Sequence, residues 1–360
     1  MKNRTEVAKN RRSFLRGTLA TGAAIAGATA LSEHKLFAQN SASLNEGDVA
    51  ILKFVAAAEL IETDLWQQYA ELGGFTNETQ NPYQLAFQNL DSDGSQYITS
   101  NTLDEQSHAE FLNAYLISKG EEPVDLDRFR TLPSSTADGA QQIGRLTNLT
   151  QLKIDTSWYT RYRSTTNPDF GATFAQALPQ LFAGRFTAIP RTNADLSPAN
   201  HIQAIANTAA FHFASIEQGG SSLYPTLGQK VTSLEVLKIM FSIGGDEVAH
   251  FLEWMDFSGN AVQPPVAPVT DPDTGLKFPN FNAKPNPLLQ TNLIFPVPCE
   301  FISPNLPRCA VIRPTSPGQI DALGAANFLI NSGLFIGQPN EFNKLLLTMA
   351  NEADAAKRES

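Results

Sequence analysis

Apolar residues recur at intervals of three and four in four long stretches of this chain, at about 47–72, 100–119, 198–224 and 233–257. This spacing places apolar side chains on one face of a helix. The first stretch shows it well, since Ile51, Phe54 and Ile61 share a stripe before Gly73-Gly74 provides a stop signal. The pattern predicts an all-α fold with four long helices.

A long connection separates the second and third of these helices. It spans about 80 residues, carries several prolines, and is expected to contain only short helices near 149–154 and 172–181. Such a length inside a compact domain is explained by a crossover that joins two helical hairpins. Between the first two helices, Asp91-Ser92-Asp93-Gly94 is interpreted as a turn, because its glycine comes too early for a calcium-binding loop and no acid closes it.

The chain divides further at both ends of this four-helix region. We expect the bundle at 46–257, an irregular proline-rich segment at 258–316, and a helical C-terminal extension at 317–360 with helices near 319–331 and 341–357.

The first 38 residues have the layout of an export signal. A basic start leads into Arg11-Arg12-Ser13-Phe14-Leu15-Arg16 and then into a run of small apolar residues. The run is shorter than the roughly twenty residues of a spanning helix, which argues against the alternative of a membrane anchor. The pattern predicts a cleaved twin-arginine-type signal peptide at 1–38 and a periplasmic or otherwise exported protein. No later stretch predicts a transmembrane helix.

The net charge limits the expected binding partners, and the two cysteines raise the question of a disulfide. The chain has a net charge of −10, and residues 1–38 hold seven Lys/Arg and two Glu, so the remainder carries about −15. Such an acidic protein is not expected to bind nucleic acid. Cys299 and Cys309 lie ten residues apart, which leaves two alternatives for an exported chain: a disulfide or two thiols.

Two short motifs carry the chemistry. Glu105-Gln106-Ser107-His108 and Glu247-Val248-Ala249-His250 each place a carboxylate and an imidazole on one helical face, since residues i and i+3 are neighbours there. The first and third helices contribute single glutamates, Glu59 and Glu217, each followed seven residues later by an aromatic residue, Trp66 or Tyr224. The order Glu, Glu-x-x-His, Glu, Glu-x-x-His is that of a carboxylate-bridged dimetal bundle.

The ligand types indicate the metals. Two neighbouring divalent ions repel each other strongly, so their site needs several anionic ligands. Mixed oxygen and nitrogen ligands suit two iron ions, or manganese. The predicted metal ligands are Glu59, Glu105, His108, Glu217, Glu247 and His250, with Glu62 as an alternative first-helix ligand. Six protein ligands leave positions at which dioxygen, peroxide or water could bind.

Other polar and aromatic residues receive simpler interpretations. His212 lies off the Glu217 register and is expected to be a packed or surface residue, and His201 and His34 are not expected to be ligands. The aromatic residues near the ligand faces, which include Trp66, Tyr69 and Trp254, are expected mainly to fill the core.

These motifs resemble those of the ferritin-like superfamily, and in particular the exported bacterial ferritin-like domain group that includes desiccation-related proteins. In the crossover, TNLTQLKIDTSWYTRYR and NPDFGATF are similar to the linker of that group. The resemblance implies the same six metal ligands. The chain departs from a standard ferritin in its longer crossover, in Gly219-Gly220 and Gly244-Gly245, which are expected to interrupt helices, and in its C-terminal extension. We therefore do not expect a storage cage.

Two functions are consistent with this sequence. The first is redox chemistry at an iron or manganese pair with dioxygen or peroxide, either ferrous oxidation or peroxide removal under stress. The alternative is a non-catalytic stress or desiccation-associated protein that uses its C-terminal extension for assembly or binding. A homo-oligomer is compatible with both.

Overall fold

The computed structural model describes residues 43–76, 80–162, 175–283, 296–297, 299, 302–311 and 321–359. The predicted signal peptide at 1–38 lies outside these ranges and stays a prediction, as do the predicted domain boundaries. Contacts divide the chain into one unit of Leu44–Ile117 and Glu121–Ser360 and another of Met1–Ser43 and Ser118–Gly120. The description below concerns the first of these units.

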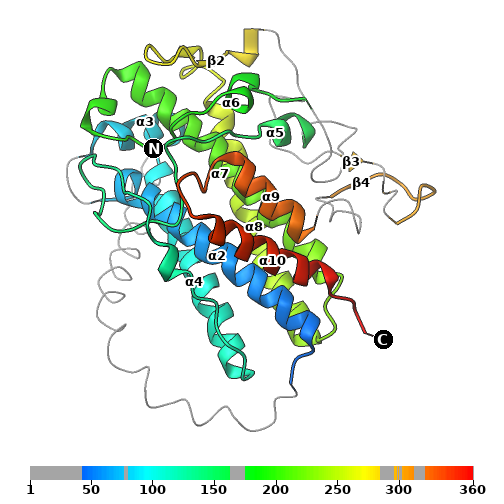
Figure 1. Cartoon of the computed structure of the whole chain (residues 1–360). Coiled ribbons are helices and arrows are strands. Elements are labelled where there is room, and N and C mark those ends of the chain that lie inside the picture. The colour runs from blue at the N-terminus through cyan, green and yellow to red at the C-terminus, as the bar shows by residue number, and fades with distance from the viewer. Residues whose placement is uncertain are drawn as a thin grey trace, which may run out of the picture. The chain divides into compact units, whose positions relative to one another are not determined.

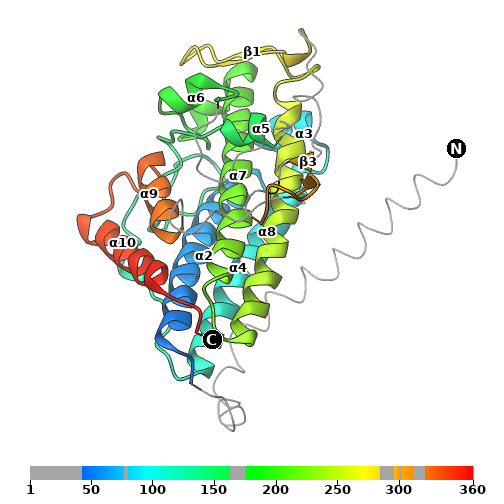
Figure 2. The same cartoon turned by 90° about the vertical axis from the view of Figure 1, so that its right-hand side faces the viewer.

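The described residues are mostly helical, as predicted. The four long helices are α2 (Glu46–Gly73), α4 (Gly94–Ser118), α7 (Ala199–Gly228) and α8 (Leu234–Asn260). Each overlaps one of the four apolar stretches of the sequence. In both Figure 1 and Figure 2 these helices lie side by side.

Hydrogen bonds between the long helices show that neighbours run in opposite directions. Between α2 and α4, the hydroxyl of Thr63 lies 3.2 Å from the carbonyl oxygen of Glu105, and that of Thr102 lies 3.2 Å from the carbonyl oxygen of Trp66. A later residue of α2 thus meets an earlier residue of α4. The helices α7 and α8 form another extensively packed pair.

The other two pairings follow the same rule. Between α4 and α8, Trp254 Nε1 donates to Asn101 Oδ1 at 2.6 Å, and the Tyr115 hydroxyl donates to Glu235 at 2.9 Å. Between α2 and α7, the Tyr69 hydroxyl lies 2.8 Å from Nδ1 of His212, and Trp66 Nε1 lies 3.0 Å from Glu217 Oε1. Every long helix therefore contacts two others, and the apolar stripes meet in a common core.

Side-chain caps define where two of these helices begin. Asn45 accepts a hydrogen bond from the amide of Asp48 at 2.7 Å, and Ser233 accepts one from the amide of Glu235 at 3.2 Å. Such caps satisfy amides that have no partner within the helix. The Asp48 carboxylate also accepts from the amides of Thr232 and Ser233, each at 2.8 Å, which joins the start of α8 to the start of α2.

The glycine pairs do not interrupt the helices, and that prediction was wrong. Gly219-Gly220 lies inside α7, Gly244-Gly245 lies inside α8, and α7 also continues through Pro225. The physical reason is close packing between α7 and α8. A Cβ atom on Gly244 would lie 2.7 Å from Cβ of Tyr224, so the absence of a side chain permits the contact that holds both helices.

The connections contain more structure than the sequence indicated. The helix α3 (Pro82–Leu90) was not predicted, and it begins with a capping box formed by Asn81 and Gln84. After it, Asp91 to Asp93 form the expected turn, in which the Asp91 carboxylate accepts from the amide of Asp93 at 2.9 Å.

Over its described residues, 119–162 and 175–198, the crossover holds four short elements: η1 (Asp127–Phe129), α5 (Ser157–Arg161), α6 (Pro179–Ala183) and η2 (Asn193–Leu196). The helix predicted near 149–154 is absent, because Leu152 instead forms an extended bridge with Phe186. Of the helix predicted near 172–181, only the end coincides with α6, and residues 172–174 lie outside the described ranges.

The C-terminal part packs against the long helices. It contains the strand pairs β1 (Val269–Thr270) with β2 (Lys277–Phe278) and β3 (Pro296–Val297) with β4 (Cys309–Ala310), and the short helix η3 (Phe281–Ala283). The predicted terminal helices are confirmed as α9 (Ala322–Ser332) and α10 (Asn340–Ala355). The apolar face of α10, with Phe342 and Leu346 buried, packs on α2.

Cys299 is buried, Cys309 is exposed, and no disulfide joins them. Of the two alternatives for this pair, the structure has the reduced one. Among the helices of the described ranges, none combines the length and the apolar character needed to cross a membrane.

Candidate metal centre

The six predicted ligands come together from the four long helices. Glu59 comes from α2, Glu105 and His108 from α4, Glu217 from α7, and Glu247 and His250 from α8. The four glutamates are at most 1% exposed, and the histidines 8% and 5%. The long helices thus bring four carboxyl groups and two imidazoles to one point in the core.

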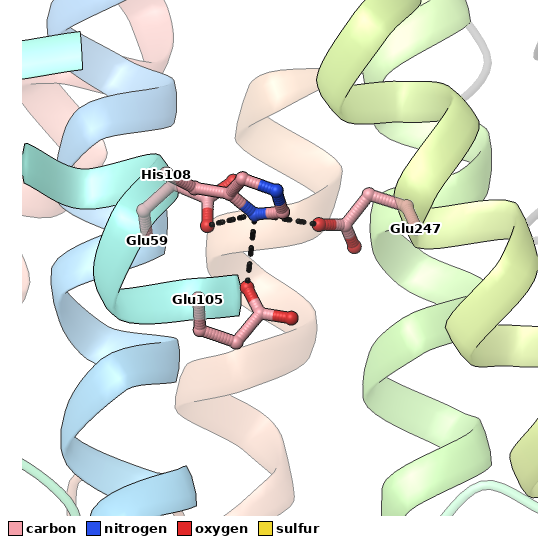
Figure 3. A group of neighbouring side chains, drawn as sticks. All are labelled: Glu59, Glu105, His108 and Glu247. Atoms are coloured by element: carbon pink, nitrogen blue, oxygen red, sulfur yellow. Dashed lines mark ion pairs between the residues drawn. The ribbon is translucent and has the colours of Figure 1, made fainter. Parts of the chain in front are cut away.

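The ligand atoms form two overlapping groups, each with all its atoms within 4.8 Å of one another. Glu59, Glu105, His108 and Glu247 form the first group, shown in Figure 3. Glu105, Glu217, Glu247 and His250 form the second. Glu105 and Glu247 belong to both groups, whereas each remaining ligand belongs to one. Two carboxylates common to both groups would offset the repulsion between two neighbouring cations.

Both histidines direct the same ring nitrogen inward. Nδ1 of His108 lies 3.4 Å from Glu59 Oε2 and 3.4 Å from Glu105 Oε2, and 3.7 Å from Glu247 Oε1. Nδ1 of His250 lies 3.1 Å from Glu105 Oε1 and 3.3 Å from Glu217 Oε2. The inner nitrogen of each imidazole is therefore the one that could ligate a cation.

The outer nitrogens face two aspartates that sequence reasoning missed. Nε2 of His108 lies 3.3 Å from Asp246, and Nε2 of His250 lies 3.4 Å from Asp104. A proton on Nε2, shared with a carboxylate, leaves the Nδ1 lone pair available inward. Each aspartate directly precedes the glutamate of a Glu-x-x-His motif and contacts the histidine of the other motif, so the sequence did carry a signal for both.

Asp104 and Asp246 also mark the side on which the site approaches solvent. Their side chains are 45% and 43% exposed, in contrast to the enclosed glutamates. Oxygen atoms of both lie close to His250 in a third group of potential ligands. The imidazoles therefore stand between the buried carboxylates and this exposed acidic edge.

Aromatic and amide donors hold the glutamates. Trp66 Nε1 donates to Glu217 Oε1 at 3.0 Å, and the Tyr224 hydroxyl donates to Glu59 Oε1. Trp66 follows Glu59 by seven positions but donates to Glu217, and Tyr224 follows Glu217 by seven positions but donates to Glu59. Each aromatic residue thus holds the glutamate of the opposite helix across the α2–α7 contact. These predicted core residues also have a polar role in the site.

Asn101 is a further residue of the site that the sequence did not reveal. Its Oδ1 accepts from Trp254 Nε1, so its Nδ2 must face the site, where it donates to Glu105 Oε1 at 2.8 Å. The same nitrogen lies 3.4 Å from Nδ1 of His250. Asn101 precedes Glu105 by one helical turn, which places both on one face of α4.

Several buried atoms of the site have no hydrogen-bond partner among the residues that the structure describes. They are Glu59 Oε2, Glu105 Oε2, His108 Nδ1, Glu217 Oε2 and both carboxylate oxygens of Glu247. An unsatisfied buried polar atom costs about 1–3 kcal/mol, and more when charged, so such a concentration needs an explanation. Five oxygens and a nitrogen that converge without donors fit divalent cations.

The electrostatics support the same conclusion. Burial and the nearby Glu217 carboxylate raise the pKa of Glu105 to about 7. Burial and the carboxylates around it raise the pKa of Glu247 well above its usual range. Burial alone lowers the pKa of His108, but its contacts with Asp246, Glu105 and Glu59 raise it to about 12. Without a cation, the site thus retains protons that a bound metal ion would displace.

The remaining candidates lie outside the two groups. Glu62 is only partly buried and belongs to neither group, although burial and the Glu105 carboxylate raise its pKa. His212 was expected to be either packed or on the surface, and it is packed in the core. Its Nδ1 contacts the Tyr69 hydroxyl. His201 lies 2.6 Å from Asp271 and 3.4 Å from Asp195, in a separate cluster.

Comparisons with known proteins add no assignment: no family model, curated protein or solved structure matches this chain. The fold and the site define a helical protein with buried clusters of glutamate and histidine that could hold two metal ions.

Proposed function

We propose that this protein binds two redox-active metal ions, iron or manganese, and uses them in chemistry with dioxygen or peroxide. The observation that carries the proposal is the pair of overlapping ligand groups, in which Glu105 and Glu247 are common to both. Four carboxylates balance the charge of two divalent ions, and two neutral imidazoles complete the set. When bound, such ions supply electrons and Lewis acidity.

The chain's own residues would hold and shield this centre. Glu59 with His108 would hold one ion and Glu217 with His250 the other, and Glu105 and Glu247, which belong to both groups, would be available to either. Tyr224 keeps its proton, because burial and the Glu59 carboxylate raise its pKa, and it presents that proton to Glu59. Trp66 of α2, Phe213 of α7 and Trp254 of α8 are buried and pack with ring centroids 4.7–5.3 Å apart, which shields the site from water.

The proposal includes a ferritin-like four-helix bundle and export. The order of ligands along the chain, the long crossover after α4 and the antiparallel contacts among the four helices support the bundle. The segment Arg11 to Arg16 supports export through a twin-arginine-type signal. This route suits a protein that folds around its metals before export.

Turnover by the purified, metal-loaded protein tests the redox function. The expected result is consumption of dioxygen with ferrous iron, or consumption of peroxide, and loss of at least about tenfold in rate in Glu247→Ala. The variant Glu110→Ala, on the exposed face of α4, is a matched control that should keep the parent rate. A parent protein that binds two ions but turns over neither reactant would favour the non-catalytic alternative.

A further inference from the structure

Each of the helices α7 and α8 carries a pair of adjacent glycines next to the candidate metal centre. Glycine in a helix interior costs about 1 kcal/mol relative to alanine, so four of them in two helices need a reason. The members of each pair differ in their surroundings. A Cβ atom on Gly219 or Gly245 would meet nothing within 4 Å, whereas one on Gly220 or Gly244 would collide with the neighbouring helix.

The collision at Gly220 involves a ligand. A Cβ atom there would overlap Oε2 of Glu247 and would lie 2.7 Å from its Cδ and 3.2 Å from its Cγ. The carboxylate of Glu247 therefore rests directly on the backbone of α7. Gly220 follows Glu217 by three residues and lies on the same helical face, so this contact keeps Glu247 near the α7 ligand.

We propose that Gly220 is a positioning residue of the metal centre, whose missing side chain lets Glu247 reach both ligand groups. This inference rests on the proposed dimetal function. In the described part of the chain, neither oxygen of Glu247 has a hydrogen-bond partner that would hold it in place. The space above Gly220 is thus the feature that fixes where this shared carboxylate lies.

A side chain at position 220 would disturb the metal site more than it would destabilise the fold. The colliding atoms belong to the end of a flexible glutamate, which can move away from α7 at low cost. At Gly244, the colliding atom is Cβ of Tyr224, which cannot move without the backbone. Gly220→Ala is therefore expected to displace Glu247 from Glu217 and His250, whereas Gly244→Ala is expected to disturb the packing of α7 on α8.

The test compares Gly220→Ala with Gly219→Ala in the full chain. Both changes give the same gain in helix propensity at adjacent positions, but only the first meets Glu247. Equilibrium dialysis against Mn²⁺, followed by elemental analysis, should give two equivalents for the parent and for Gly219→Ala. Gly220→Ala should bind its second ion at least about tenfold more weakly while it keeps the parent's circular dichroism. Two ions bound by Gly220→Ala with parent affinity would overturn the proposal.

A double-mutant cycle tests the same contact without metal. Glu247→Asp shortens the side chain by one methylene and should relieve the collision, so Gly220→Ala/Glu247→Asp should melt at a higher temperature than the sum of the single changes predicts. Additive effects would overturn the positioning role. If the parent and Gly219→Ala bind neither Mn²⁺ nor, under anaerobic conditions, Fe²⁺, the proposed function fails, and the cycle still decides whether Gly220 positions Glu247.

Discussion

The indole nitrogen of Trp66 on α2 donates a hydrogen bond to Oε1 of Glu217 on α7, at 3.0 Å. Both residues are fully buried, and the other oxygen of Glu217 faces the inner nitrogen of His250 at 3.3 Å. The bond holds the glutamate in one orientation and leaves its second oxygen free to meet a cation. A core tryptophan is thereby part of the outer shell of the candidate centre.

Trp66→Phe should weaken metal binding more than it weakens the fold. It removes the donor to Glu217, and loss of such an outer-shell partner typically lowers metal affinity by about 10–100-fold. Trp158→Phe is the matched control, because Trp158 is equally buried and its Nε1 has no hydrogen-bond partner within the described ranges. Metal titration of both variants should show weaker binding only in Trp66→Phe. Equal affinities in the two variants would contradict this role.

A second prediction concerns the attachment of the crossover to α2. The buried carboxylate of Asp64 lies 2.7 Å from Arg130 Nη1 and accepts from the amide and the hydroxyl of Thr147 at 2.9 and 2.7 Å. Asp64→Asn removes the charge from this network and should lower the free energy of unfolding by about 3 kcal/mol.

Asp127→Asn controls for loss of charge beside the same arginine. Asp127 lies 3.1 Å from Arg130 Nε, but its side chain is 82% exposed, so its loss should cost less than about 1 kcal/mol. Urea unfolding of both variants measures the difference. Similar destabilisation by the two changes would mean that Asp64 contributes no more than a surface ion pair.

A third prediction concerns pH and the His201 cluster, which lies apart from the metal ligands. Burial opposes protonation of His201, but hydrogen bonds and charge from Asp271 and Asp195 raise its pKa. The pKa of Asp195 is lowered to about 2 despite its burial, chiefly by hydrogen bonds from Arg191 and then by His201. A raised histidine pKa stabilises the fold fully below the unfolded value of about 6.5, and this contribution disappears as pH rises through the folded pKa.

His201→Gln should therefore destabilise the protein more at pH 5.5 than at pH 9.5. The expected cost at the lower pH is about 2 kcal/mol, the scale of a charge-assisted hydrogen bond. Denaturant unfolding of parent and variant at both pH values measures it. His212→Gln provides the opposite contrast, because burial lowers the pKa of His212 to about 3 and only the unfolded state then takes up a proton between pH 9.5 and 5.5. The cost of His212→Gln should therefore be smaller at pH 5.5 than at pH 9.5, by about 1.4 kcal/mol. A pH-independent difference for His201→Gln would contradict the assignment.

The long helices and their ligands could be predicted from the sequence because both depend on local spacing. Apolar residues at intervals of three and four define α2, α4, α7 and α8. The same periodicity places Glu105 with His108, and Glu247 with His250, on one helical face. The seven-residue interval from Glu59 to Trp66 and from Glu217 to Tyr224 indicated a shared face. It could not indicate that each aromatic residue donates a hydrogen bond to the glutamate on the other helix.

The features that were missed depend on contacts distant in sequence. Gly220 and Gly244 look like helix breakers until α7 and α8 are packed together, and the Leu152–Phe186 bridge replaces a helix through pairing across the crossover. Asn101 is an ordinary polar residue until Trp254 fixes its amide. Asp104 and Asp246 could have been noticed beside the motifs, but only the structure shows that each serves the opposite histidine.

The most direct measurement is the metal content of the protein purified from its native cells. Elemental analysis of the parent should find about two equivalents of iron or manganese per chain, and Glu105→Ala/Glu247→Ala, which removes both shared carboxylates, should lose them. Metal-free parent protein, together with a double variant of unchanged stability, would contradict the dimetal account.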